Sequence, residues 1–187
     1  MQQSRLSSRT VATFLLALGL ASTCSEAALT RDEGLNAAVA DFAYIDTSGE
    51  PSDQTAVHRK RLQAFMTALR ADLERDPALD LLPSSCPPLC NIDDRTPADH
   101  FRAAAKAGAK VLVTGGIHKL STLVQWAKVT AFDVDTNRVL FSKLFTFRGD
   151  NDEAWQRAEV FVSREIRAAL VTERPAHNEA KEDGEHP

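Results

Sequence analysis

Residues 110–147 read KVLVTGGIHKLSTLVQWAKVTAFDVDTNRVLFSKLFTF and contain three runs rich in Val, Phe, Leu and Thr, with no helical pattern between them. We predict one β-strand in each run, over residues 110–120, 123–134 and 139–147. The polar segment 133–138 joins the last two strands as an antiparallel hairpin. The adjacent Gly115 and Gly116 indicate a bulge or the close approach of another backbone.

The residues before this region alternate between strand and helix patterns. Residues 36–45 are almost continuously apolar and predict a buried first strand. A helix follows, capped by Ser52 or Asp53 and ended by Pro77, and residues 79–82 form a short second strand. The apolar side chains of this helix have the i, i+3, i+4, i+7 spacing of one buried face and are Leu62, Phe65, Met66, Leu69 and Leu73.

Two further helices flank residues 110–147. Thr96 and Pro97 open the first of them and Gly108 follows its end. Its side chains predicted to face the core are Phe101, Ala104, Ala105 and Ala107. The second helix begins at Asp150, and Glu153 completes a capping box with it. Its predicted buried side chains are Trp155, Ala158, Val162, Ile166 and Ala169.

The element order is therefore β-α-β-α-β-β-β-α. It predicts an α/β fold of the mixed α+β kind, a five-stranded mixed sheet with helices packed on it. The length of 187 residues suits one domain, which we place at residues 28–171.

The amino-terminal residues have the pattern of an export signal. Arg5 and Arg9 precede an apolar run at 11–21, and a small-residue region ends at Ala27. We predict a signal peptide over residues 1–27, cleaved after Ala27, because the apolar run is too short to anchor in a bilayer. The alternative is a lipoprotein signal that uses Cys24, but Thr23 and the lack of a Leu three residues before Cys24 count against it.

We predict that the mature protein is soluble, that it is periplasmic or secreted, and that it has no transmembrane segment. Residues 172–187 are acidic, have no large apolar side chain and predict a disordered tail. The whole chain has a net charge of −4, which argues against a general nucleic-acid binder.

Cys86 and Cys90 are the only cysteines after the predicted signal. In an oxidising compartment such a pair forms a disulfide by default. The alternative is a cysteine-dependent redox protein or hydrolase in which Cys86 or Cys90 acts with His100 or His118. No further ligands with suitable spacing point to a metal, so we expect neither a metal nor another cofactor.

A binding surface is expected where strand ends meet the loop before the last helix. Asp41 is a further candidate, because a carboxylate within an apolar strand needs backbone donors or a Lys or Arg partner. The basic run at 58–61 is interpreted as a solvated helix face. The residues of the expected surface are His118, Lys119, Ser121, Arg148, Asp150 and Trp155.

Four segments carry a resemblance to a known family. They are VADF at 39–42, GIHKLS at 116–121, FDVDT at 132–136 and RGDNDEAW at 148–155. They resemble a family of small secreted bacterial proteins classed as a domain of unknown function, over most of residues 37–170. Members tend to carry a Cys pair two residues apart, whereas Cys86 and Cys90 are separated by three.

The element order is also similar to the amino-terminal domain of the Tol–Pal protein TolB and to related outer-membrane assembly lipoproteins. This resemblance implies a mixed α/β fold. The association of family members with periplasmic quinoprotein alcohol-oxidation systems implies an accessory role.

We therefore expect a non-catalytic binding or assembly protein whose partner is another periplasmic or envelope protein. A small extracytoplasmic enzyme and a small-molecule binder are the alternatives.

The cysteine pair gives the first test. Thiol titration of the unfolded, exported protein is expected to find no free thiol, because Cys86 and Cys90 are oxidised. The double replacement Cys86→Ser/Cys90→Ser is expected to keep function. Two titratable thiols, together with loss of function in the double variant, would support the cysteine-dependent enzyme instead.

Overall fold

A computed structural model describes residues 34–83 and 96–172 of the chain. The predicted signal peptide with Cys24, the Cys86 and Cys90 segment and residues 173–187 of the predicted tail lie outside the described residues.

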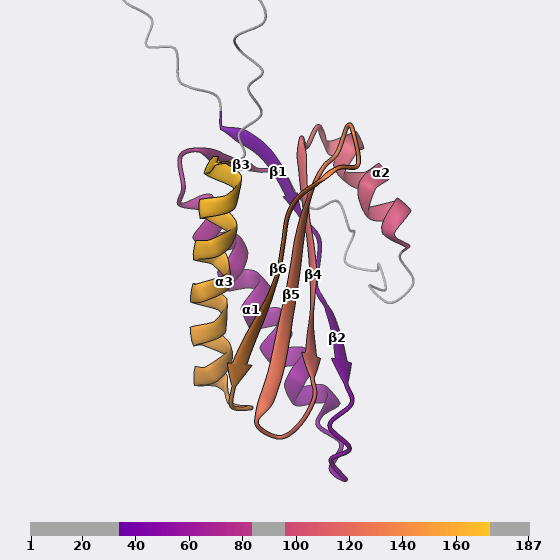
Figure 1. The fold of residues 1–187 in the computed structure, drawn as a ribbon, viewed down its shortest axis with the longest axis vertical. Helices are drawn as coiled ribbons and strands as arrows, with labels where there is room; N and C mark the ends of the chain where they lie inside the picture. The colour runs from indigo at the N-terminus through magenta and orange to yellow at the C-terminus, as the bar shows by residue number, and fades with distance from the viewer. Residues whose placement is uncertain (1–33, 84–95, 173–187) are drawn as a thin grey trace, which may run out of the picture. The chain divides into compact units, whose positions relative to one another are not determined.

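The described residues form a mixed sheet, which confirms the predicted α/β class (Figure 1). Its order is β3-β1-β4-β5-β6, and β2 also pairs with β4. The pairs β1–β3, β1–β4 and β2–β4 are parallel, whereas β4–β5 and β5–β6 are antiparallel. The six strands are β1 (Leu35–Val39), β2 (Ala43–Asp46), β3 (Leu79–Leu81), β4 (Val111–Lys119), β5 (Val124–Asp133) and β6 (Val139–Arg148).

The sixth strand arises because the run predicted as one strand is divided in two. Val39 is paired with Val113 and Ala43 with Gly116, so three residues on one side face two on β4. Phe42, in the break, is fully buried, and a Cβ at Gly115 would come within 2.6 Å of its ring. Gly115 therefore leaves the space that Phe42 occupies. The Lys128 carbonyl oxygen also lies 2.6 Å from this Cβ position, which confirms the predicted close approach of another backbone.

Three helices cover the sheet: α1 (Thr55–Glu74), α2 (Pro97–Ala107) and α3 (Asp152–Thr172). Figure 1 shows α1 and α3 on one side of the sheet and α2 on the other, near the start of β4. The main core lies under α1 and α3 and contains Phe65, Leu69 and Trp155. A smaller cluster under α2 joins Ala104 to Leu112 and Val134.

The predicted helix ends are confirmed for α2 and wrong for the start of α3. Thr96 and Gly108 bound α2 as predicted, with Gly108 at a φ of +83°. The predicted cap of α3 is wrong: Asn151, not Asp150, accepts the hydrogen bond from the Ala154 backbone N–H at 2.8 Å. The Asp150 carboxylate is instead drawn away by three basic side chains.

Two predicted core positions are also wrong. Ala105 of α2 is exposed, because α2 lies on the sheet by a narrow face on which only Ala104 is buried. On α3, Leu170 takes the buried position instead of Ala169, which is half-buried.

A carboxyl group lies buried between α1 and α3. Glu159 of α3 is 2% exposed, and its Oε1 has no partner among the described residues. Burial, reinforced by the neighbouring Asp72 of α1, raises the pKa of Glu159 to about 7. The folded protein therefore holds a proton on Glu159 that the unfolded chain releases at a lower pH.

This carboxyl group predicts a pH-dependent stability. Between pH 4.5, the ordinary pKa, and about 7, the folded state binds the extra proton, so the free energy of unfolding falls as pH rises. Glu159→Gln should remove this fall and stabilise the protein at pH 8 by up to ~3 kcal/mol. Urea unfolding at pH 5 and pH 8 measures the difference, with the exposed Glu153→Gln as control; equal pH dependence in Glu159→Gln and the parent would contradict the assignment.

Candidate functional site

The predicted surface residues do not form one surface, because neighbouring side chains of a strand point to opposite faces. Lys119, at the end of β4, points to the face covered by α1 and α3. His118 points to the other face, where a hydrogen bond of 2.7 Å joins its Nε2 to Thr47 Oγ1. The predicted site is thus divided into a buried half and an exposed half.

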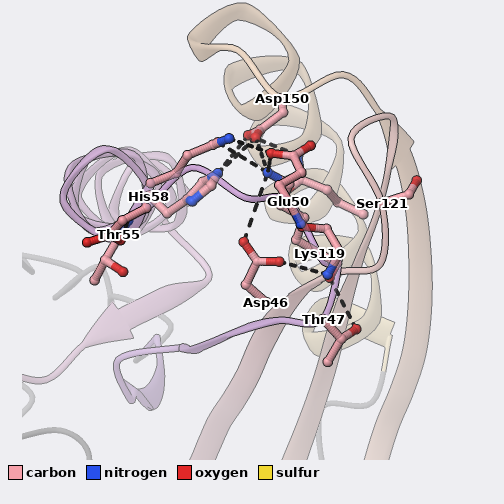
Figure 2. Close-up of polar contacts among 12 residues, drawn as sticks. Asp46, Thr47, Glu50, Thr55, His58, Lys119, Ser121 and Asp150 are labelled. Carbon is pink, nitrogen blue, oxygen red and sulfur yellow. Dashed lines mark hydrogen bonds and ion pairs between the residues drawn. The ribbon is translucent and has the colours of Figure 1, made fainter.

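The buried half is built around Lys119, whose side chain is 0% exposed. Its Nζ lies 2.7 Å from Asp150 Oδ2 and 2.8 Å from Glu50 Oε2. It also donates to Gln54 Oε1 at 3.2 Å, and Asp46 Oδ2 lies 4.0 Å away. The ammonium therefore sits among oxygen atoms from the β2–α1 segment and the β6–α3 turn (Figure 2).

Asp150, the partner of Lys119, contacts several further side chains, and its own side chain is 10% exposed. His58 Nε2 donates to its two carboxylate oxygens at 2.9 Å each, and Arg61 Nη1 donates to Oδ1 at 2.7 Å. Gln125 Nε2 lies 3.4 Å from Oδ1 and donates to the Gly149 carbonyl at 2.9 Å. We call these interacting side chains the ion cluster; its members are Glu50, Gln54, His58, Arg61, Lys119, Gln125 and Asp150.

Local geometry places Asp150 in the cluster. Gly149 has a φ of +100°, a conformation that other residues rarely adopt, and its Cβ position lies 3.0 Å from the Ala154 Cβ. The turn after β6 therefore directs Asp150 toward β4 and α1. On α1, His58 and Arg61 are three residues apart and so share one helix face.

The charges in the cluster hold one another ionised. Burial alone would raise the pKa of Asp150, but the hydrogen bonds from Lys119 and His58 outweigh it and keep this pKa below its usual value. Burial alone would lower the pKa of Lys119, but Asp150 and Glu50 outweigh it and raise this pKa. The cluster thus acts as a network of matched charges between the β2–α1 segment, α1, β4 and the β6–α3 turn.

The exposed half is a part of the sheet that no described helix covers. Ile45, His118, Trp126 and Thr146 form one cross-strand row through β2, β4, β5 and β6. Ile45 is 55% exposed, and the His118 and Trp126 rings meet edge to face at 6.0 Å. We call this row and the next one the open face; the next row is Ala43, Gly116, Lys128 and Leu144.

The other predicted residues lie elsewhere. Ser121 Oγ accepts hydrogen bonds from the Leu123 and Val124 backbone N–H groups and so shapes the β4–β5 turn. Trp155 is 2% exposed and belongs to the core, which excludes it from a surface. Arg148 is exposed at the end of β6.

Asp41 does not lie within a strand, because it falls in the break between β1 and β2. It is half-buried, and its Oδ1 accepts a hydrogen bond of 2.5 Å from Arg70 Nη2. The same guanidinium nitrogen donates to the Val39 carbonyl at 3.2 Å. Arg70 therefore links α1 to the segment between β1 and β2.

The interpretation of residues 58–61 as a solvated face is wrong for half of them. His58 is 1% exposed and stacks on Tyr44 with ring centroids 4.8 Å apart, while Arg61 reaches Asp150 and Asp152. Only Arg59 and Lys60 are exposed. Residues 148–150 also read Arg-Gly-Asp, but the Asp150 carboxylate of this tripeptide is engaged in the ion cluster.

The described residues contain neither a metal-binding group of side chains nor a membrane-spanning helix. No group of three or more His, Cys, Asp or Glu side chains in this part of the chain is placed to hold a metal ion. Within residues 34–83 and 96–172, no helix is long and apolar enough to cross a membrane.

Sequence reasoning missed Glu50, His58, Arg61 and Gln125 as partners of Lys119 and Asp150. The sequence carried a signal for Gln125 alone. This polar residue stands at the first of the alternating buried positions of β5, and the other buried positions are apolar. The remaining partners are brought together only by tertiary structure, since Lys119 is 69 residues from Glu50 and His58 is 92 residues from Asp150.

The ion cluster predicts two different stability losses. Asp150→Asn leaves Lys119 and Arg61 without their shared carboxylate, and removing one partner of a buried pair costs about 3–5 kcal/mol. Lys119→Met should cost less, because Asp150 keeps His58 and Arg61. Urea unfolding near pH 7 measures both variants, with Asp135→Asn, in an exposed ion pair with Lys110, as control. A loss below about 1 kcal/mol for Asp150→Asn would contradict the role of the cluster.

Several solved structures are similar to this chain at low sequence identity. CT253 of Chlamydia trachomatis is 13% identical, with a TM-score of 0.48, over 74% of this chain and 99% of that protein. TolB of Acinetobacter baumannii is 17% identical, with a TM-score of 0.46, over 76% of this chain; the match spans only 29% of TolB. The LpoB carboxy-terminal domain of Salmonella enterica is 10% identical, with a TM-score of 0.41, over 61% and 82% of the two chains.

No curated protein matches the sequence. A family model described as "Protein of unknown function (DUF2380)" matches residues 35–166, which include all six strands, α1, α2 and most of α3. The chain therefore belongs to this family of proteins of unknown function.

Proposed function

We propose that this protein is exported to the periplasm and acts there as a non-catalytic accessory protein that binds another envelope protein through the open face. The export step rests on the signal pattern of residues 1–27. The observation that carries the binding role is the exposure of large apolar side chains on two adjacent rows of the sheet.

The open face has the chemistry of a protein-binding surface. Ile45 is 55% and Leu144 49% exposed, and Trp126 lies between their strands. Ile45 on β2 and Leu144 on β6 are separated by β4 and β5, and the half-buried Trp126 is the apolar side chain between them. Exposed apolar side chains rimmed by polar groups mark interaction sites in soluble proteins. Lys128 is exposed beside Leu144, so a partner that presents a carboxylate next to an apolar patch would fit both residues.

The ion cluster supports a non-catalytic role. Lys119, the group that could act as a base or a nucleophile, has no exposed surface and is held as a cation by Asp150 and Glu50. His118 lies on the opposite face of the sheet, away from these carboxylates. The buried charges thus hold segments of the fold together, and the open face is the surface that is left for contact with a partner.

The proposal predicts which variants lose the partner. Leu144→Asp and Trp126→Ala should abolish or strongly reduce one envelope protein that co-purifies with the tagged protein from a periplasmic extract. The physical reason is the loss of apolar area, or its replacement by a charge, at the centre of the contact.

The matched control is Val57→Asp, on α1, where a side chain of 48% exposure lies outside the open face. Mass spectrometry of the co-purified proteins identifies and quantifies the partner. A partner retained by both open-face variants, or lost equally with Val57→Asp, would contradict binding at the open face, and a tagged protein found only in the cytoplasm would contradict export.

A further inference from the structure

The two edges of the sheet differ in length. One edge is formed by two short strands, β3 of three residues and β2 of four, whereas the other is β6, which has ten. Among the described residues β6 pairs only with β5, so its outer side carries unpaired backbone N–H and C=O groups. A long, regular edge strand is a template for pairing with another extended chain, and proteins usually protect such edges.

A groove runs beside this edge, between β6 and α3. It has a volume of about 170 Å³, and its lining includes Phe145, Phe147 and Phe161. Phe161 is 42% exposed and meets the Phe145 ring edge-on at 5.6 Å. Ala154 and Ala158 form the floor from α3. The groove therefore has the size and the apolar walls to take one large side chain.

The charge at the groove is positive. Arg148 and Arg157 line it, and Arg148 makes no ion pair with any described residue. Arg157 is paired with Glu153, which is itself exposed. A ligand that enters the groove would therefore gain from carrying a carboxylate near its apolar side chain.

A second copy of this chain does not supply that carboxylate. An antiparallel pairing of β6 with β6, centred on Lys143, would bring Lys143 against its own copy and Arg148 against Arg138, which are like charges. Centred on Leu144, the pairing would place Leu140 opposite Arg148. The edge therefore fits a chain of different sequence better than it fits itself.

We propose that β6 accepts an extended segment of a partner protein as an additional strand of the sheet. The segment places an aromatic side chain in the groove beside Phe161 and a carboxylate at Arg148. Main-chain hydrogen bonds to the edge supply affinity, and the groove selects the side chain, as in other cases of strand addition. This surface adjoins the open face along β6 and shares Thr146 with it, but it uses the edge of the sheet and the groove beside α3, so the inference goes beyond the proposed function.

The test uses the peptide acetyl-ETVTFTVTE-amide, which places Val, Phe and Val on one face of a strand and a carboxylate at each end. A control peptide of the same composition, acetyl-TTVVFTTEE-amide, lacks the alternation. Titration of the full chain, labelled with ¹⁵N, should shift the amide signals of β6 and of the groove and slow hydrogen exchange at alternate β6 residues. The control peptide should bind at least about tenfold more weakly.

Phe161→Asp should weaken binding of the first peptide at least about tenfold, because it removes an aromatic wall of the groove. Val160→Asp is the matched control, since Val160 is 54% exposed on the same helix but does not line the groove. Thermal melting verifies that both variants fold. The proposal is overturned if the peptide leaves the β6 signals unchanged or if both variants weaken binding equally. It is also overturned if the chain alone sediments as a dimer in which alternate β6 amides already exchange slowly.

Discussion

The contact between Lys119 and Asp150 holds together segments that are far apart in the sequence. Lys119 ends β4, Asp150 follows β6, and both reach the β2–α1 segment and α1 through Glu50, His58 and Arg61. A charge with no exposed surface is expensive to bury, and such a pair is tolerated when several hydrogen bonds satisfy it, as they do here. The ion cluster therefore links the start of α1 and the start of α3 to the end of β4.

The ion cluster and the open face lie on opposite faces of the sheet. The buried charges of the ion cluster lie under α1 and α3, where they neutralise one another, whereas the exposed side chains of Ile45 and Leu144 lie on the sheet face that the described helices leave uncovered. The open face and the β6 edge meet along β6, since Leu144 and Thr146 belong to the open face and Phe145 and Phe147 line the groove. One strand therefore offers an apolar surface on its outer face and a groove at its edge.

The sequence predicted the elements well because local signals determine them: the hairpin from 123 to 147, the Thr96 cap and the α1 periodicity are confirmed. It predicted the site less well. Lys119 and Asp150 were predicted to line a binding surface, but both lie in the ion cluster under α1 and α3. Their burial follows from strand alternation and from the Gly149 turn, and their partners lie up to 92 residues away. The single strand predicted at 36–45 divides because Phe42 packs against Gly115, a contact that no local pattern encodes.

We propose that this protein works through contact at the open face, while its buried charges stabilise the fold. Site-specific photo-crosslinking in living cells tests this most directly, with the reactive side chain placed at Ile45, which is 55% exposed on the open face, or at Arg59, which is exposed on α1. We expect a covalent adduct with one envelope protein from position 45 and none from position 59. An adduct from position 59 alone, with none from position 45, would contradict binding at the open face.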